Sequence, residues 1–306
     1  MPIIEVDNLH KAYGTIKALN GLSFHVTAGE IFGMLGPNGA GKTTTVEIIE
    51  GLRSADAGRV SVLDMDVARV PAKIKERIGV QLQAPSLLPL LTVQEILGLF
   101  GSFYKKSLSA EEALKLLALE ESRRVLVKNL SGGQQQRLSV ALALINDPDI
   151  AFLDEPTTGL DPQARHSLWS VIEDMRKRGK TVFLTTHYMD EAEHLCDRVA
   201  IVDHGQIIAQ GSPRALIKDH IRETAIEFEM EPPPPNSLLE ELPGTTQVSL
   251  EQGTVTIYSS DIAATLSSLL KYTEQTKVDD QLKNLRVREA TLEDVFLKLT
   301  GRRIRE

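Results

Sequence analysis

The sequence lacks the features that define several special classes of protein. Its single cysteine, Cys196, cannot form an internal disulfide. No apolar run approaches the roughly 20 residues that cross a bilayer, and stretches such as residues 140–145 are among the longest. No signal-peptide pattern opens the chain. We therefore expect a cytosolic protein, with any membrane work done by another polypeptide.

An excess of positive charge is also missing. The formal net charge is -8, so no overall positive field is available to hold a nucleic-acid backbone. The seven histidines are scattered without metal-ligand spacing, which argues against a zinc site. Composition is otherwise that of a globular protein, with 42% hydrophobic and 25% charged residues. We expect no nucleic-acid partner.

The pattern of apolar residues predicts an α/β protein. Residues 1–30 alternate apolar and polar positions, as short antiparallel strands do. Three compact apolar runs have the character of strands buried in a parallel sheet: residues 31–35, 150–153 and 181–184. Between the first two of these runs, residues 92–144 are mostly helical in pattern.

A change of pattern near residues 211–213 suggests a domain boundary. We expect a first domain over residues 1–222, containing a helical subdomain at about 85–145. Residues 223–306 are expected to form a small α+β domain, because short strand-like runs there alternate with two helical segments. The order of its strands is not predicted.

The first motif that carries chemistry is a glycine-rich loop between a predicted strand and a predicted helix. It fits the pattern G-x-x-x-x-G-K-[ST] and consists of Gly36, Pro37, Asn38, Gly39, Ala40, Gly41, Lys42, Thr43 and Thr44. Backbone N–H groups in such a loop, together with the helix N-terminus, bind phosphate. Lys42 adds a full positive charge, and the Thr43 hydroxyl is suited to Mg²⁺. The loop predicts a nucleotide-phosphate site.

The second motif is a pair of carboxylates at the end of a buried strand. The apolar run 150–153 leads directly into Asp154 and Glu155. Successive strand side chains point in opposite directions, so the two groups can take different roles. Asp154 is the candidate Mg²⁺ ligand and Glu155 the candidate base that polarises the attacking water. Taken alone, the pair could equally form an exposed acidic turn.

The third motif is the discriminating one. The sequence Leu130, Ser131, Gly132, Gly133, Gln134 resembles the LSGGQ signature of the ABC ATPase family. Ser131 and the glycine N–H groups at a helix start form a second anion site. In the family that this sequence resembles, the two phosphate-binding surfaces meet only across a head-to-tail dimer, where each pair encloses one ATP. The resemblance therefore implies a homodimer of ATPase subunits.

Four further positions match family landmarks. The resemblance implies that Gln83 senses Mg²⁺ or water, and that His187 contacts the γ-phosphate. It also implies that Tyr13 stacks on adenine and that Asp161 belongs to the D-loop. Structural explanations compete for three of them, since Asp161 is a good helix cap, a histidine that ends a strand is commonly structural, and tyrosines commonly serve in packing.

The resemblance implies a fold and an activity. The fold is a P-loop NTPase of the ABC type, with a mixed-sheet core, an antiparallel β subdomain and a helical subdomain. The activity is ATP hydrolysis, with Lys42, Gln83, Glu155 and His187 as catalytic residues and ATP and Mg²⁺ bound. Residues 290–301 are similar to bacterial exporter subunits of the daunorubicin-type, lipid and polysaccharide groups. The expected partner is a separate integral-membrane permease, with this chain peripheral on the cytoplasmic face.

Two other uses of the same ATPase core remain open at this point. DNA-repair relatives insert a long coiled coil or a zinc module between the phosphate loop and the signature. Here Lys42 and Ser131 are 89 positions apart without a sustained heptad repeat. Translation-associated relatives carry two cores, and this sequence has one. Both features favour the transport subunit.

Overall fold

The computed structural model describes residues 1–81, 87–221, 223–251, 253–276 and 282–301. It divides into two compact units, Met1–Pro213 and Arg214–Arg303. This division falls at the change of sequence pattern near residues 211–213, and the expected domain boundary at 222/223 stays a prediction.

An antiparallel sheet forms one side of the first unit. Its order is β2-β1-β4-β5, with the bounds Ile16–Thr27, Pro2–Tyr13, Ala57–Val62 and Met65–Asp66. The first two strands are 12 residues each and are longer than the short strands expected. β2 continues through Asn20, where register shifts occur along its pairing with β1 and the Asn20 N–H donates to the Gly205 carbonyl at 2.8 Å.

A six-stranded mixed sheet forms the centre of the first unit. Its order is β10-β9-β3-β8-β7-β6, with the bounds Gln206–Gly211, Arg198–Asp203, Ile31–Leu35, Thr181–Thr186, Ile150–Asp154 and Ile78–Gln81. All neighbours are parallel except β10 and β9, which form a hairpin. The three apolar runs in the sequence are therefore adjacent central strands, β3, β8 and β7. Their carboxyl ends lie at one edge, where α/β proteins build ligand sites.

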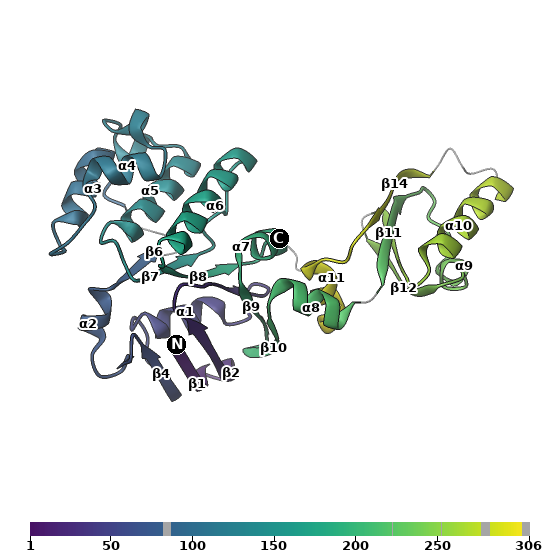
Figure 1. Ribbon diagram of the computed structural model, residues 1–306, viewed down its shortest axis with the longest axis horizontal. Coiled ribbons are helices and arrows are strands. Elements are labelled where there is room, and N and C mark those ends of the chain that lie inside the picture. Colours follow the sequence, from purple (N-terminus) through teal and green to yellow (C-terminus); the bar gives the residue numbers. More distant parts are fainter. Residues whose placement is uncertain (82–86, 222, 252, 277–281, 302–306) are drawn as a thin grey trace. The chain divides into compact units, whose positions relative to one another are not determined.

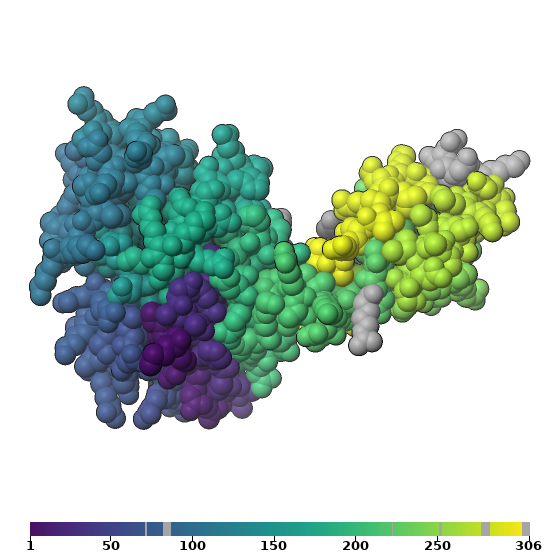
Figure 2. Space-filling model, in the orientation of Figure 1, coloured from purple at the N-terminus to yellow at the C-terminus, as the bar shows by residue number. Residues whose placement is uncertain are grey.

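Helices cover this sheet and extend from it. Their bounds are α1 Lys42–Ile49, α2 Pro71–Lys75, α3 Val93–Gly101, α4 Ala110–Leu116, α5 Gly132–Leu144, α6 Pro162–Lys177 and α7 Met189–Leu195. Capping boxes begin α3 at Thr92 and α4 at Ser109, as the sequence predicted. Within the first unit, α3, α4 and α5 gather away from the antiparallel strands (Figure 1). In the space-filling view the blue-teal residues of α3 and α4 lie at the top of this unit and the purple residues of β1 and β2 lie at its bottom (Figure 2).

The core of the first unit joins its two sheets. Phe24 of β2 stacks on Phe32 of β3 with ring centroids 5.4 Å apart. Phe32 contacts Phe183, and Phe183 contacts Phe152, at 5.4 and 5.6 Å. Such ring pairs contribute about 1 kcal/mol each beyond the area they bury. The run of rings fixes β3, β8 and β7, and so fixes the strand ends that carry the predicted site.

The second unit contains a four-stranded antiparallel sheet of order β12-β13-β11-β14. Its elements are α8 Pro213–His220, β11 Thr224–Glu229, α9 Asn236–Glu240, β12 Thr245–Glu251, β13 Thr254–Ser259, α10 Ile262–Thr276, β14 Lys283–Arg288 and α11 Leu292–Thr300. From β11 to β14 they follow the β-α-β-β-α-β order of ferredoxin-like folds. Leu239 of α9 and Leu269 of α10 pack on one face of the sheet.

The described residues include no helix that is both long and apolar enough to cross a bilayer.

Candidate functional site

The glycine-rich loop closes around the Lys42 ammonium. Gly41 has φ +106, and a Cβ there would lie 2.6 Å from the Ala18 carbonyl oxygen, so a side chain has no room. The Lys42 Nζ donates to the carbonyl oxygens of Gly36 at 2.6 Å and Pro37 at 3.3 Å. Burial lowers the pKa of Lys42, and the neighbouring carboxylates oppose that shift. The ammonium is thus held inside the loop on α1.

Asp154 ends β7 and faces the start of α1. It is 6% exposed, and it accepts hydrogen bonds from the Thr185 hydroxyl and, at 3.4 Å, from the Thr43 hydroxyl. Burial raises the pKa of the Asp154 carboxyl. A cation beside the Asp154 carboxylate would lower its pKa again. Mg²⁺ prefers oxygen ligands such as this carboxylate, and it usually takes only one or two of its ligands from the protein. Thr43 and Asp154 therefore fit a magnesium ion that is otherwise coordinated by phosphate.

Glu155 follows in a left-handed backbone conformation, with φ +48. Its N–H donates to the Thr185 carbonyl at 3.1 Å and hydroxyl at 3.2 Å. The Gln136 amide donates to the carbonyl of Glu155 at 3.3 Å and to that of the next residue at 2.9 Å. Strain of about 1–3 kcal/mol at such a residue persists only where neighbours fix it. These contacts aim the carboxylate at the loop.

The Glu155 carboxylate lies between two predicted site residues. Its Oε1 is 3.8 Å from the Lys42 Nζ and 3.2 Å from the His187 Nδ1. His187 directly follows β8, and Glu155 directly follows β7. The parallel sheet therefore brings Lys42 and His187 to the adjacent pair Asp154 and Glu155, although the three segments are far apart in the sequence.

The signature forms the start of α5. Ser131 is its N-cap: the Ser131 Oγ accepts from the Gln134 N–H at 3.3 Å, and the Ser131 N–H donates to the Gln134 side chain at 2.9 Å. Gly132 and Gly133 form the first helical turn. Throughout the described ranges, no hydrogen bond or ion pair joins these residues to the glycine-rich loop. Within one chain the two anion sites are separate.

Three remaining predicted residues have different outcomes. Tyr13 ends β1 and is 41% exposed, with the Arg53 guanidinium 5.3 Å and the Lys11 ammonium 5.8 Å from its ring centroid. Asp161 is the N-cap of α6, accepting from the Ala164 N–H at 2.9 Å. Gln83 lies outside the described residues.

Sequence reasoning missed two residues that shape the site. Thr185 bonds both members of the carboxylate pair, and Gln136 holds the backbone after β7. Each stands close to a motif in the sequence, Thr185 two positions before His187 and Gln136 two positions after Gln134, the last signature residue. Their roles depend on neighbours that are distant in sequence, so spacing alone gives no signal for them.

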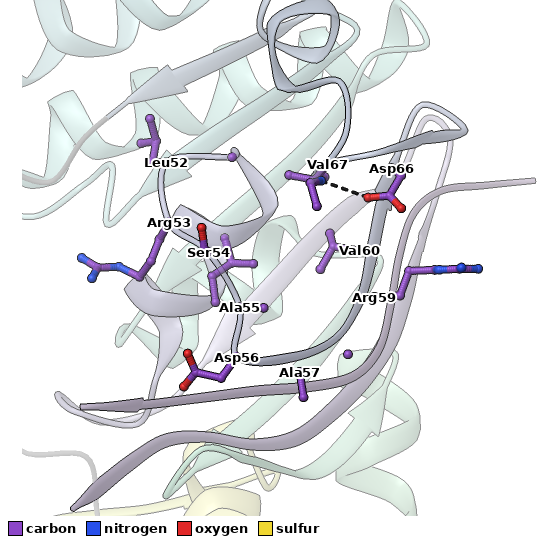
Figure 3. Close-up of a pocket in the computed structure, with 14 residues that line it drawn as sticks. Leu52, Arg53, Ser54, Ala55, Asp56, Ala57, Arg59, Val60, Asp66 and Val67 are labelled. Atoms are coloured by element: carbon purple, nitrogen blue, oxygen red, sulfur yellow. Dashed lines mark hydrogen bonds between the residues drawn. The ribbon is translucent and has the colours of Figure 1, made fainter. Parts of the chain in front are cut away.

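A separate cavity of about 410 Å³ lies beside the C-terminal end of α1 (Figure 3). Residues 51–60 and 66–68 form most of its lining, with Ile48. None of the predicted site residues lines it. The cavity is therefore distinct from the carboxylate and lysine cluster.

Comparison with known proteins decides the family. Residues 19–158 match the family "ABC transporter". The chain is 43% identical over 316 residues to Nod factor export ATP-binding protein I of Burkholderia lata, covering all of both chains. This chain belongs to the ABC transporter family. The ABC protein of the same name from Paraburkholderia xenovorans is 42% identical over 311 residues, covering 99% of this chain and 98% of that one.

Solved ABC cassettes share the fold of the first unit. A dimeric cassette in a post-hydrolysis state bound to ADP and Pi has a TM-score of 0.64 and 30% identity, covering 68% of this chain and 98% of that chain. The predicted ABC-type P-loop fold is thus confirmed. This chain is an ATP-binding subunit of an ABC transporter with an ABC ATPase domain, homologous to export ATP-binding proteins. The DNA-repair and translation alternatives are set aside.

Proposed function

We propose that this ABC subunit hydrolyses MgATP with Glu155 as the base and that hydrolysis drives export. One observation supports this most directly: the Glu155 carboxylate lies 3.8 Å from the Lys42 Nζ and 3.2 Å from the His187 Nδ1. Lys42 neutralises developing phosphate charge, Glu155 takes the proton of the attacking water, and His187 fixes the γ-phosphate and the base relative to one another. Tyr13 stacks on the adenine.

Magnesium belongs to this proposal. The Thr43 hydroxyl and the Asp154 carboxylate would hold the ion, and Gln83 would complete its protein ligands. When bound, Mg²⁺ neutralises negative charge on the phosphates. The contact between Thr43 and Asp154 at 3.4 Å keeps both oxygens on the side of the glycine-rich loop where phosphate binds.

We further propose that the complete site needs two copies of the chain. The glycine-rich loop of one copy, residues 36–44, would bind the triphosphate from one side. From the other side the second copy would supply Ser131, the N–H groups of Gly132 and Gly133, Gln134, and its D-loop Asp161. Both surfaces are helix N-termini, which favour anions. Their separation within one chain is the reason to expect a head-to-tail homodimer.

The direction of transport and the membrane partner are part of the same proposal. Two relatives that align over nearly the whole chain are named as export ATP-binding proteins. We propose an integral-membrane permease as partner, with this subunit peripheral on the cytoplasmic face. Leu90 and Phe103 of the helical subdomain are 71% and 68% exposed, and large exposed apolar side chains are suited to a protein interface.

Glu155→Gln tests the assignment of the base. The amide keeps the shape of the side chain and cannot take a proton, so hydrolysis should fall at least about 100-fold. ATP binding should persist, and the trapped ATP should hold the dimer together. Phosphate release measures the first effect, and size-exclusion chromatography with MgATP measures the second.

The matched control is Glu111→Gln, which makes the same change on an exposed side chain of α4. It should hydrolyse ATP at the parent rate. Parent-level hydrolysis by Glu155→Gln would show that another group is the base.

A further inference from the structure

A buried carboxyl, that of Glu191, lies near the proposed site and forms none of the proposed nucleotide contacts. Glu191 of α7 has no exposed surface, at 0%. Its Oε1 accepts a hydrogen bond from the Trp169 indole Nε1 at 3.1 Å. Trp169 is the single tryptophan of the chain and is itself held between two histidine rings, with centroids 4.9 Å away at His166 and 4.6 Å at His194. One carboxylate oxygen is therefore anchored to α6.

Two buried hydroxyls, those of Thr157 and Thr186, act on the same carboxyl. Thr157 and Thr186 are both 0% exposed. Burial raises the pKa of Glu191, and these two hydroxyls, with the Trp169 indole, oppose the rise. The Glu191 Oε2 and the Thr157 Oγ1 each lack a hydrogen bond of normal geometry to any residue that the structure describes. Buried polar atoms in native proteins are nearly always paired, so a small shift of Thr157 that completes this bond is favourable.

Each hydroxyl belongs to a segment of the proposed site. Thr157 lies two residues after Glu155, and the N–H groups of Thr158 and Leu160 donate to the carbonyls of Glu155 and Thr157 at 3.3 and 3.1 Å. These bonds make residues 155–160 one compact turn, so a displacement of Thr157 would also displace Glu155. Thr186 directly precedes His187, and its hydroxyl accepts from the Tyr188 N–H at 2.9 Å.

We propose that Glu191 is a positioning residue that holds the Glu155 turn and the His187 segment relative to each other, acting through Thr157 and Thr186. The proposal rests on the proposed function of Glu155 and His187. Their facing atoms are 3.2 Å apart and belong to different loops, so a common support beneath both loops fixes that distance. Misplacement of about 1 Å costs on the order of 100-fold in rate. Glu191 forms none of the proposed nucleotide contacts, so its loss should reduce kcat and leave KM for ATP nearly unchanged.

Three variants of the full-length chain test this. Glu191→Leu removes every polar contact and should lower kcat at least about 10-fold, with KM for ATP within about 2-fold. Glu191→Gln keeps the acceptor for Trp169 and offers N–H groups to the two hydroxyls, so it should stay within about 3-fold of the parent kcat. Glu193→Gln, on the same helix with an exposed side chain, is the control and should match the parent.

A fourth variant guards against a folding failure of Glu191→Leu. Thr157→Val removes only a hydroxyl and keeps the shape of the side chain. It should lower kcat about 3- to 10-fold at constant KM, because Glu191 then loses its hold on the Glu155 turn. Thermal unfolding of each variant, followed by Trp169 fluorescence, identifies those that fold.

The outcomes separate cleanly. Loss of kcat alone in Thr157→Val and in folded Glu191→Leu, with recovery in Glu191→Gln, supports the proposal. A parent-level kcat in Thr157→Val overturns it. So does a loss of kcat in Glu191→Leu that Glu191→Gln does not rescue, or one that is accompanied by a parallel rise in KM. Failure of the proposed function has a different signature in the same assay: the parent does not hydrolyse ATP, or Glu155→Gln hydrolyses it normally.

Discussion

Glu50 is a buried carboxyl near the carboxylate and lysine cluster. It follows α1 directly and is 2% exposed. Burial, with the nearby charges of Asp154 and Glu47, raises the pKa of Glu50 from 4.5 to about 8. The folded protein therefore keeps a proton that the unfolded chain releases between these two values. In that window stability falls as pH rises, by about 1.4 kcal/mol per pH unit.

Glu50→Gln should remove this dependence. The amide is neutral at every pH, so the variant should be more stable than the parent by about 2 kcal/mol or more at about pH 8, with the gain nearly gone at about pH 5. Denaturant unfolding at the two pH values measures the difference. Glu76→Gln, on an exposed side chain, should give the same small difference at both. An equal gain for Glu50→Gln at both pH values would contradict the assigned cause.

For single residues, the sequence motifs predicted candidate site residues. They did not predict residues such as Glu50, whose properties depend on burial in the folded protein. Lys42, Asp154, Glu155 and His187 lie close together, because strand ends of one parallel sheet carry three of them, and their catalytic roles stay a prediction. Glu50 looked like any helix-end glutamate in the sequence. Its burial depends on how α1 packs against the central sheet, which local pattern does not encode.

At the scale of elements, the second unit is tied together by a charged cluster. Asp294, near the start of α11, is 2% exposed and accepts from the Arg288 guanidinium, the Tyr258 hydroxyl and the Thr291 N–H. Arg288 also donates to Glu227 of β11 at 2.7 Å. Burial acts to raise the pKa of Asp294, but the hydrogen bonds from Arg288, Tyr258 and Thr291 hold it below its ordinary value. The cluster pins α11 to the sheet.

Asp294→Asn should loosen α11. It leaves Arg288 without one of its two carboxylate partners, and breaking a buried pair costs about 3 kcal/mol. In the parent, the ionised Asp294 carboxylate stabilises the fold fully at pH values above the ordinary carboxyl pKa. This stabilisation is lost as the pH falls through the lowered pKa of Asp294. Hydrogen exchange should accelerate at the amides of Leu292–Thr300. Glu293→Gln, on the exposed neighbour, is the control, and unchanged exchange in Asp294→Asn would contradict the role of the cluster.

Elements were predictable to different degrees. The helices with capping boxes and the central strands agree with the sequence pattern because their signals are local. The five-residue helix α9 was missed, since it is too short for an apolar period and follows the proline run 232–235. The order β12-β13-β11-β14 was not predicted either, because pairing between strands far apart in the sequence leaves no local mark.

At the scale of the whole molecule, the proposed mechanism requires two half-sites, and every chain carries both. One is the glycine-rich loop with Lys42, and the other is the helix start at Ser131. Family membership and the ABC fold are shown by the comparisons. The pairing of half-sites between copies is the central proposal, because it explains why one polypeptide carries two anion sites that do not contact each other.

Mixing two inactive variants tests that proposal most directly. Lys42→Ala destroys the loop half-site, and Ser131→Arg blocks the signature half-site while leaving the loop intact. Ser109→Ala, which weakens an equivalent helix cap on α4, controls for the loss of the cap and should remain active. Each of the two site variants alone should fail to hydrolyse ATP. Their mixture should hydrolyse it, because one mixed dimer combines an intact loop with an intact signature. Full-rate hydrolysis by Ser131→Arg alone would contradict the account.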